Sequence, residues 1–425
     1  MIAPGNLSVV IPTHNRKERV TGTLQALALE AGAGVEFEVI VVADACEDGT
    51  EAALDLLASR LPFPLRICSH AARNAAATRN LGASGARGAT LVFLDDDMEP
   101  QPGLVRAHSD ARGPRSVVMG YSKPVYAGRP TPWQQDARRW WEDSFREMAS
   151  FGHRFTYRDF FSGNCSLPAS LFHSLGGMDA SLGRLEDYEF GWRMLGAGAS
   201  FHFEPAALAL HHDASDLDLW LARARHEGEA DFRTGTRHPE VRYLLSHLAM
   251  PGSATRMTRL ARKLAFALPA RGDGVVKSLA SLAGGLRRRG ARGIYFRVVA
   301  LLREYNYARG VALASGGRRS LLAWLQEGPL EPSMAGDAPV LDADAPPGPE
   351  RFAGLLEAAS RTGLRVRYAG VEIGALPPRV GAEPLRSEHV RRWLHEFLTS
   401  SFVPEWAMQN AEAGLPLDVQ EVQAC

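Results

Sequence analysis

Short runs of apolar and β-branched residues alternate with helical patterns through the first hundred residues. Four such runs lie at residues 7–11, 37–43, 65–68 and 90–94, and apolar residues at helical spacing follow each of the first three. Continuous apolar runs of this length are typical of parallel strands that are buried on both faces. Strands that alternate with helices form βαβ units. The pattern therefore predicts a parallel, doubly wound α/β sheet.

The fourth run leads directly into three consecutive carboxylates, Asp95, Asp96 and Asp97. In open α/β sheets, ligands bind beyond the carboxyl ends of the strands. Adjacent carboxylates repel one another, and a divalent cation relieves this repulsion because Mg²⁺ and Mn²⁺ prefer oxygen ligands. A metal-dependent site is one interpretation of this turn. The other is an ordinary solvated turn after a strand.

Further elements are predicted beyond residue 113. They are a strand at 116–121, an aromatic-rich helix at 133–145, a turn at 161–166 that leads into a helix at Pro168, and an extended segment at 206–210. The tryptophans of the aromatic helix have two possible uses, which are packing in the core and lining a binding site for a sugar or a flat apolar acceptor.

Composition limits the class of protein. The chain has 425 residues, enough for two or three domains, and its 48 basic and 48 acidic residues cancel. Its four cysteines form no CxxC pair, which argues against a disulfide scaffold or a zinc site. There is no signal-peptide pattern and no apolar run of about 18 residues. We therefore expect a cytoplasmic protein.

The zero net charge conceals a strongly basic segment. Residues 253–320 contain 15 arginines and lysines against two acidic residues, with leucines interleaved at helical spacing. Basic amphipathic helices of this kind can lie on anionic lipid, here the inner face of a membrane. The alternative is that they pack on the preceding domain with their arginines facing solvent or an acidic partner. Nucleic acid is not expected, since aromatic and motif signals are missing.

An ordered series of motifs resembles the family-two glycosyltransferases, which have the GT-A fold. The matching segments are residues 10–16, 41–50, 77–82, 93–97, 163–167, 176–179 and 186–193, followed by Pro205 and His211. The resemblance covers roughly residues 5–235. It implies an inverting, metal-dependent transfer of a sugar from a nucleoside diphosphate donor to an acceptor hydroxyl. The favoured donor is a UDP-sugar. The acceptor would be a sugar, a lipid-linked or a small molecule, as in glycan, cell-surface polysaccharide or natural-product biosynthesis.

The resemblance also implies a role for individual residues. Asp187 would be the general base that takes the acceptor proton, and Glu186 or Glu189 would orient the acceptor. Asp97 and His211 would bind Mn²⁺ or Mg²⁺. The nucleotide would be bound by Pro12, Thr13, His14, Asp44, Arg79, Asp95 and Asp96.

Several of these assignments have a structural alternative. Acidic residues such as Asp187 also suit the first turn of a helix, where the helix dipole favours negative charge. Asp44 could cap a turn, His14 could stack on the base or fill space, and Arg79 could be a solvated arginine on a helix face. The helix at 220–232 offers Arg223 and Arg225, either of which could meet phosphate.

We predict four segments along the chain. Residues 1–240 would form the GT-A catalytic domain, 241–327 a basic helical extension, 328–350 a linker rich in Pro, Gly, Ala and Asp, and 351–425 a small C-terminal α/β module. The family resemblance does not reach the last module, and its role stays unassigned.

Three rival functions remain open. A retaining transferase of the same fold is disfavoured by the Glu186–Asp187 pair. A nucleotidyltransferase would need a Gly-rich basic loop after the first strand, which this chain lacks. A catalytically silent sugar-nucleotide-binding or scaffold protein is favoured by Ala43, which stands where the family often has a first acidic residue. The variant Asp187→Asn separates an enzyme from a binding protein.

Overall fold

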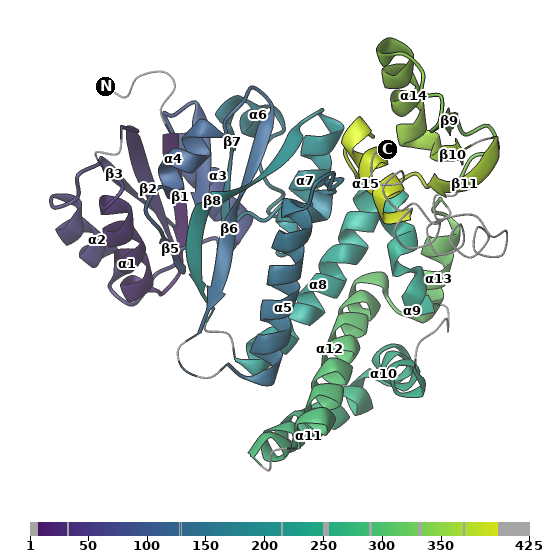
Figure 1. The fold of residues 1–425 in the computed structure, drawn as a ribbon. Helices are drawn as coiled ribbons and strands as arrows, with labels where there is room; N and C mark the ends of the chain where they lie inside the picture. Colours follow the sequence, from purple (N-terminus) through teal and green to yellow (C-terminus); the bar gives the residue numbers. More distant parts are fainter. Residues whose placement is uncertain are drawn as a thin grey trace. The chain divides into compact units, whose positions relative to one another are not determined.

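An eight-stranded sheet is the centre of the larger of two units into which the chain divides (Figure 1). The computed structural model describes residues 7–31, 34–126, 128, 130–213, 216–249, 255–288, 291–329, 334–368 and 370–397. The strands of this sheet are β1 (Leu7–Thr13), β2 (Phe37–Asp44), β3 (Leu65–His70), β4 (Thr90–Leu94), β5 (Met98–Pro100), β6 (Ser116–Val125), β7 (Asn164–Pro168) and β8 (Ser200–His212). Their order across the sheet is β3-β2-β1-β4-β7-β6-β8-β5.

The first four strands along the chain form a parallel half-sheet. β1 pairs in parallel with both β2 and β4, and β2 pairs in parallel with β3, which confirms the predicted βαβ arrangement. β7 runs antiparallel to β4 and to β6, while β8 is parallel to β6 and antiparallel to β5. The complete sheet is therefore mixed. The loops after β1, β2 and β4 leave the sheet at one edge.

The prediction of a turn at residues 161–166 was wrong for its second half. Asn164 begins the buried strand β7, whose polar residues make the segment look like a loop. The fully buried His108 explains the burial, since its two ring nitrogens lie 2.9 Å from the Ser166 hydroxyl and 3.0 Å from the Asn164 amide oxygen. Buried polar groups are tolerated when they are hydrogen-bonded.

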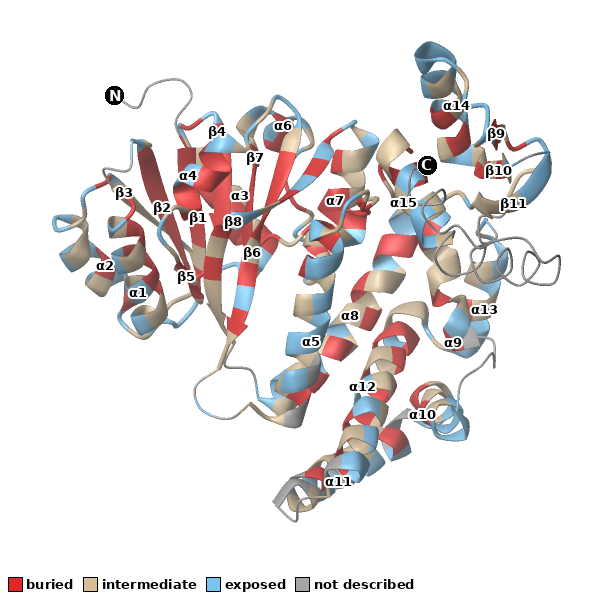
Figure 2. Ribbon diagram, in the orientation of Figure 1, coloured by how far each residue is buried: buried red, intermediate tan, exposed pale blue. Residues whose placement is uncertain are grey.

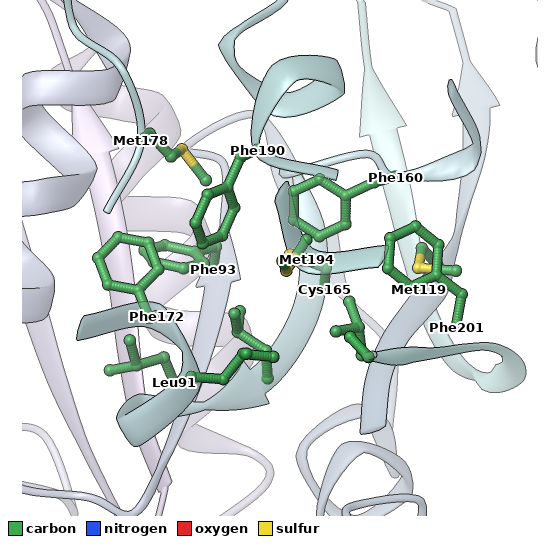
Figure 3. Close-up of a cluster of buried hydrophobic side chains, with 14 of the residues drawn as sticks. Leu91, Phe93, Met119, Phe160, Cys165, Phe172, Met178, Phe190, Met194 and Phe201 are labelled. Carbon is green, nitrogen blue, oxygen red and sulfur yellow. The ribbon is translucent and has the colours of Figure 1, made fainter. Parts of the chain in front are cut away.

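Alternate strand residues supply two separate cores. Val10 and Phe93 face one core, drawn in Figure 3, and their neighbours Val9 and Val92 face the other. Both faces of the strands are thus covered, and Figure 2 shows the sheet as largely buried. This double burial explains why the strands appear in the sequence as continuous apolar runs. The helices that cover the sheet are α1 (Lys17–Ala28), α2 (Thr50–Ala58) and α4 (Leu104–Asp110) on one face, and α3 (Ala75–Gly85), α5 (Pro132–Ala149), α6 (Ala169–Ser174) and α7 (Glu186–Gly196) on the other.

The basic segment is helical and belongs to the same unit as the sheet. Its elements, with those that lead into it, are α8 (Leu217–Arg237), η2 (Pro239–Leu245), α9 (Ser246–Ala249), α10 (Arg256–Ala267), α11 (Pro269–Arg288), α12 (Arg292–Ser315) and α13 (Arg318–Gln326). The short helix η1 (Tyr157–Asp159) lies earlier in the chain, between α5 and β7. α12 packs along α8, and Gly310 permits their close approach, because a Cβ there would collide with the Arg225 carbonyl group. In the ranges that the structure describes, no helix combines the length and apolar character needed to span a bilayer.

The second unit comprises Ala149–Arg154 and the chain from Pro332 onward. Its three-stranded sheet has the order β11-β10-β9 and packs a small core that contains Leu341, Leu364 and Val366. The range 328–350, expected to be a linker, contributes strand β9 to this sheet. Residues 398–425 of the predicted C-terminal module lie outside the described residues. The elements of this unit are β9 (Val340–Asp342), α14 (Pro349–Thr362), β10 (Leu364–Tyr368), β11 (Val371–Leu376) and α15 (Ser387–Phe397).

Candidate active site

A cleft of about 640 Å³ lies where β1, β2 and β4 end. Eleven of the site residues predicted from the sequence line it, although they come from widely separated segments. They are Pro12, Thr13, His14, Asp44, Arg79, Asp95, Asp96, Asp97, Glu186, Asp187 and His211. The fold therefore brings the predicted donor, metal and base residues into one cavity.

The middle carboxylate of the turn after β4 is held by side chains from β1 and the loop after it. Thr13 Oγ1 donates a hydrogen bond of 2.7 Å to Asp96 Oδ2, and Arg16 Nη1 lies 2.8 Å from Asp96 Oδ1. Arg16 also reaches Asp97 Oδ2 at 3.1 Å. Burial raises the pKa of Asp96 to about 6, although Arg16 opposes this shift. Arg16 was not among the residues predicted from the sequence, where its only signal is its place in the matched segment 10–16.

Asp97 and His211 face each other across the cleft. His211 Nε2 lies 3.9 Å from Asp97 Oδ1, and the other ring nitrogen, Nδ1, is buried without a hydrogen-bond partner. A carboxylate and an imidazole are suitable ligands for Mn²⁺ or Mg²⁺, and such ions often take only one or two protein ligands beside a substrate diphosphate. The pair therefore fits a divalent cation. In the described part of the chain, no cluster of three or more His, Cys, Asp or Glu side chains is arranged to hold a metal.

The adjacent His212 does not share this arrangement. Its Nε2 lies 2.7 Å from Glu99 Oε2, and it does not line the cleft. Of these two adjacent histidines, His211 is therefore the one that lines the cleft.

Arg79 is a buried link between two groups of carboxylates. Its Nη2 lies 2.5 Å from Asp95 Oδ1 and its Nη1 lies 3.4 Å from Glu186 Oε1, while only 6% of its side chain is exposed. Burial by itself would lower the pKa of Arg79, but Asp95 and Glu186 raise it above the usual value, so the guanidinium stays charged. Arg79 is therefore not a solvated helix-face arginine, and it lines the cleft from a buried position between Asp95 and Glu186.

Asp187 lies in the first turn of α7, next to Glu186, which Arg79 contacts. Burial raises its pKa, and the neighbouring Glu186 raises it further. A carboxylate with a raised pKa in a cleft is suited to accept a proton near neutral pH. Glu189 is turned away from the cleft, because its carboxylate pairs with Arg193 at 2.7 Å and with His238 at 3.1 Å. Of the two residues considered for orienting an acceptor, only Glu186 lines the cavity.

Asp44 organises the loop at the opposite end of the predicted nucleotide site. Its two carboxylate oxygens accept backbone hydrogen bonds from Arg73 and Asn74, at 2.7 and 2.8 Å. Burial alone would raise the pKa of Asp44, but these hydrogen bonds lower it. His14 Nδ1 donates to the Asp44 carbonyl oxygen at 2.5 Å. The preceding Ala43 is fully buried, so a second carboxylate there would need its own partner inside the fold.

Two arginines that form no ion pair in the described part of the chain complete the polar lining of the cleft. Arg184 and Arg223 line the cleft, and neither forms an ion pair with any residue that the structure describes. Burial lowers the pKa of Arg223, and Arg184 lowers it further, as expected for cations that lie close together. Of the two arginines considered on the helix after residue 216, Arg223 therefore reaches the cleft. Arg225 instead pairs with Asp273 at 2.9 Å.

The aromatic helix α5 contributes to both the core and the cleft. Trp133 is buried and packs against Trp220, whereas Trp141 lines the cleft next to Phe161, with ring centroids 4.8 Å apart. Trp141 also lies near His211, at a ring separation of 6.0 Å. Core packing explains Trp133, whereas Trp141 contributes an aromatic side chain to the lining of the cleft.

Residues 8–176 match the family described as Glycosyl transferase family 2. This domain belongs to that family. Together with the mixed α/β sheet, this membership confirms the predicted GT-A fold class, which is followed here by the helical region.

Three curated glycosyltransferases are similar to the family 2 domain. The uncharacterized glycosyltransferase YfnE of Bacillus subtilis is 26% identical over 48% of this chain and 64% of its own length. The pre-mycofactocin glycosyltransferase of Mycobacterium tuberculosis is 25% identical over 55% and 48%, and the validoxylamine A glucosyltransferase of Streptomyces hygroscopicus is 29% identical over 44% and 47%. The chain thus spans about half to two thirds of the length of these relatives.

Proposed function

We propose that the family 2 domain transfers a sugar from a nucleoside diphosphate donor to an acceptor hydroxyl, with inversion at the anomeric carbon. The favoured donor is a UDP-sugar. One observation carries the proposal. A single cleft holds a carboxylate–imidazole pair suited to a divalent cation, two arginines that form no ion pair with any described residue, and Asp187 with its raised pKa.

The donor diphosphate would lie near Asp97, His211, Arg184 and Arg223. Guanidinium groups bind phosphate oxygens with strong charge-assisted hydrogen bonds. The mutual repulsion of Arg184 and Arg223 in the free protein supports this role, because a bound dianion would relieve it. Asp44, His14, Pro12 and Thr13 would face the base and ribose, and Asp96 would accept from the ribose.

A divalent cation held by Asp97 and His211 would neutralise charge on the leaving diphosphate. The rest of the chemistry falls to the protein. As the acceptor oxygen forms its bond to the anomeric carbon, the carbon–oxygen bond to the diphosphate breaks and the electron pair leaves with the nucleotide. The Asp187 carboxylate takes the acceptor proton. Because attack comes from the face opposite the leaving group, the configuration inverts.

The acceptor in this proposal is the hydroxyl of a sugar, a lipid-linked molecule or a small molecule. Glu186 would orient it, held in place by Arg79, and Trp141 would offer an aromatic surface of the kind that sugars favour. The proposal places the enzyme in the cytoplasm, with peripheral contact at the inner face of a membrane.

A thermal-shift panel tests the donor part. UDP, GDP, dTDP and CDP, each with and without Mn²⁺, are added to the wild type and to Asp97→Ala. We expect one nucleotide to raise the melting temperature only when Mn²⁺ and Asp97 are both present. If no nucleotide stabilises the wild type under any metal condition, the proposed function is wrong.

A matched pair of variants tests the catalytic part. Donor turnover by Asp187→Asn is compared with that by Asp110→Asn, a change at an exposed aspartate on α4. Loss of turnover with nucleotide binding retained, in Asp187→Asn alone, supports the enzyme. Equal turnover in both variants would contradict the role of Asp187 as base.

A further inference from the structure

The outward face of α10 carries three cations interleaved with two large apolar side chains. The side chains of Arg256, Arg259 and Lys263 are exposed and form no hydrogen bond or ion pair with any residue that the structure describes. Met257 and Leu260 lie between them and are 56% and 48% exposed. We call these five residues the α10 surface.

The opposite face of α10 accounts for how the helix is held. Ala261 and Ala265 are buried in a core formed with Tyr305 and Ala308 of α12. Arg262 pairs with Glu304 at 2.6 Å. The helix therefore satisfies its packing with one face and one arginine, and packing gives no reason for the α10 surface.

Exposed side chains of the same two kinds continue along the next helices. Arg271, Val275 and Leu282 are exposed on α11, and Ile294 and Arg297 are exposed at the start of α12. The basic and apolar character is thus a property of the three-helix region and is not confined to α10.

We propose that the α10 surface docks on an anionic phospholipid bilayer. Lipid headgroups supply the negative charge that three unpaired cations attract, and the boundary between headgroups and acyl chains takes up apolar side chains at the same depth. A nucleic acid would match the cations but would leave Met257 and Leu260 in water. An acidic protein surface would likewise match the cations but not the two apolar side chains. A bilayer is the partner that suits both kinds of side chain.

This inference deepens the membrane contact included in the proposed function, but it does not depend on sugar transfer. Vesicle binding is measured without donor or acceptor. A protein that binds vesicles and lacks transfer would contradict the proposed function alone. A protein that transfers sugar and ignores vesicles would contradict the docking surface alone.

The test is co-sedimentation of the full chain with vesicles of phosphatidylcholine, alone or mixed in equal parts with phosphatidylglycerol. We expect binding to the mixed vesicles only, weakening as salt rises from about 0.05 M to about 0.5 M, because salt screens the attraction. The triple variant Arg256→Glu, Arg259→Glu, Lys263→Glu should bind about 100-fold more weakly. The matched control reverses three exposed cations elsewhere, Arg60, Arg87 and Arg139, and should bind within about 2-fold of the wild type.

A second pair of variants tests the apolar contribution. Met257→Ser with Leu260→Ser should weaken binding about 10-fold while the salt dependence stays the same, because these side chains contribute by burial. The control, Leu29→Ser with Leu56→Ser, removes two apolar side chains that are more exposed than those of the α10 surface, at 78% and 74%. It should bind like the wild type.

Four results would overturn the inference. They are equal binding to neutral and mixed vesicles, unchanged binding by the triple variant, displacement from vesicles by duplex DNA at equal charge concentration, and a dimer that the triple variant abolishes. The third would indicate nucleic acid and the fourth a second copy of this chain. Melting temperatures confirm that each variant is folded. If the triple variant fails to fold, the inference is tested by how vesicle binding of the wild type depends on salt and on lipid composition.

Discussion

Arg79 Nη2 lies 2.5 Å from the Asp95 carboxylate, and the same guanidinium reaches Glu186, which comes 107 residues after it in the chain. One buried cation thus joins the carboxylates that follow β4 to the carboxylates that begin α7. In the proposed function, the first group serves the donor and the second serves the acceptor. Arg79 is therefore a positioning residue that holds the two halves of the site together.

We predict that Arg79→Lys lowers kcat more than it weakens nucleotide binding. A lysine keeps the charge but lacks the planar fork that contacts two carboxylates at once. Arg79→Ala should also destabilise the fold by about 3 kcal/mol, because it leaves the buried Glu186 and the half-buried Asp95 without their counter-ion. Denaturant unfolding and steady-state kinetics measure the two effects. A lysine variant with wild-type kcat would show that the link has no part in catalysis.

Asp187→Asn should reduce turnover by about 100-fold to 10,000-fold, the usual contribution of a general base. The Kd for the nucleotide should stay unchanged, since the amide occupies the same volume and the donor contacts lie on other residues. Isothermal titration and a coupled assay of released nucleotide give the two values. A parallel loss of nucleotide binding would argue for a structural role of Asp187.

The rate of transfer should fall as the pH drops, with an inflection above the usual carboxylate range near about 4. The rate falls with pH because of the role of Asp187 as the base. Its carboxylate must be ionised to take a proton, and burial together with Glu186 raises its pKa. Because Arg79 lowers that pKa, the inflection in Arg79→Met should move to still higher pH. A pH–rate profile that is flat down to pH about 4 would contradict this assignment.

His211→Ala should weaken Mn²⁺ binding in the presence of nucleotide by about 10-fold or more, whereas His212→Ala should leave it unchanged. The two histidines are adjacent in β8, but only His211 faces Asp97, and His212 pairs with Glu99. Electron paramagnetic resonance of free Mn²⁺ measures binding without relying on activity. Equal losses in both variants would show that the effect comes from disturbing the strand.

The buried His108 should make the fold less stable in mild acid, because its imidazole binds a proton more readily in the unfolded chain. Burial lowers its pKa from 6.5 to about 4, so between these values the unfolded chain binds more protons and stability falls as the pH falls. The loss attributable to this residue should approach about 3 kcal/mol near pH 4. The contribution of His108 is isolated by measuring the free energy of unfolding at several pH values. The proteins compared are the wild type, His108→Gln and the exposed control His202→Gln. The His108 variant should lose the least stability on acidification.

The alternation of strands and helices predicted the parallel half-sheet, and the order of motifs predicted the family. Eleven residues named from the sequence line the cleft, but Arg16 and Arg184, which also line it, were not named. The predictions succeeded because strand periodicity and the carboxylates after Leu94 are local properties, readable from a few adjacent residues. The polar strand β7 was missed because its burial depends on His108, which lies 56 residues away from Asn164 and was not recognised as its partner.

The partner of each cleft residue was decided only by the tertiary structure. The sequence alone determined that Arg79, Asp95 and Glu186 are present in matched motifs, but not that the first would pair with the other two. It likewise left open which of Arg223 and Arg225 reaches the cleft. Such pairings depend on how strands and helices far apart in the chain converge at one edge of the sheet, and a periodic pattern carries no information about that convergence.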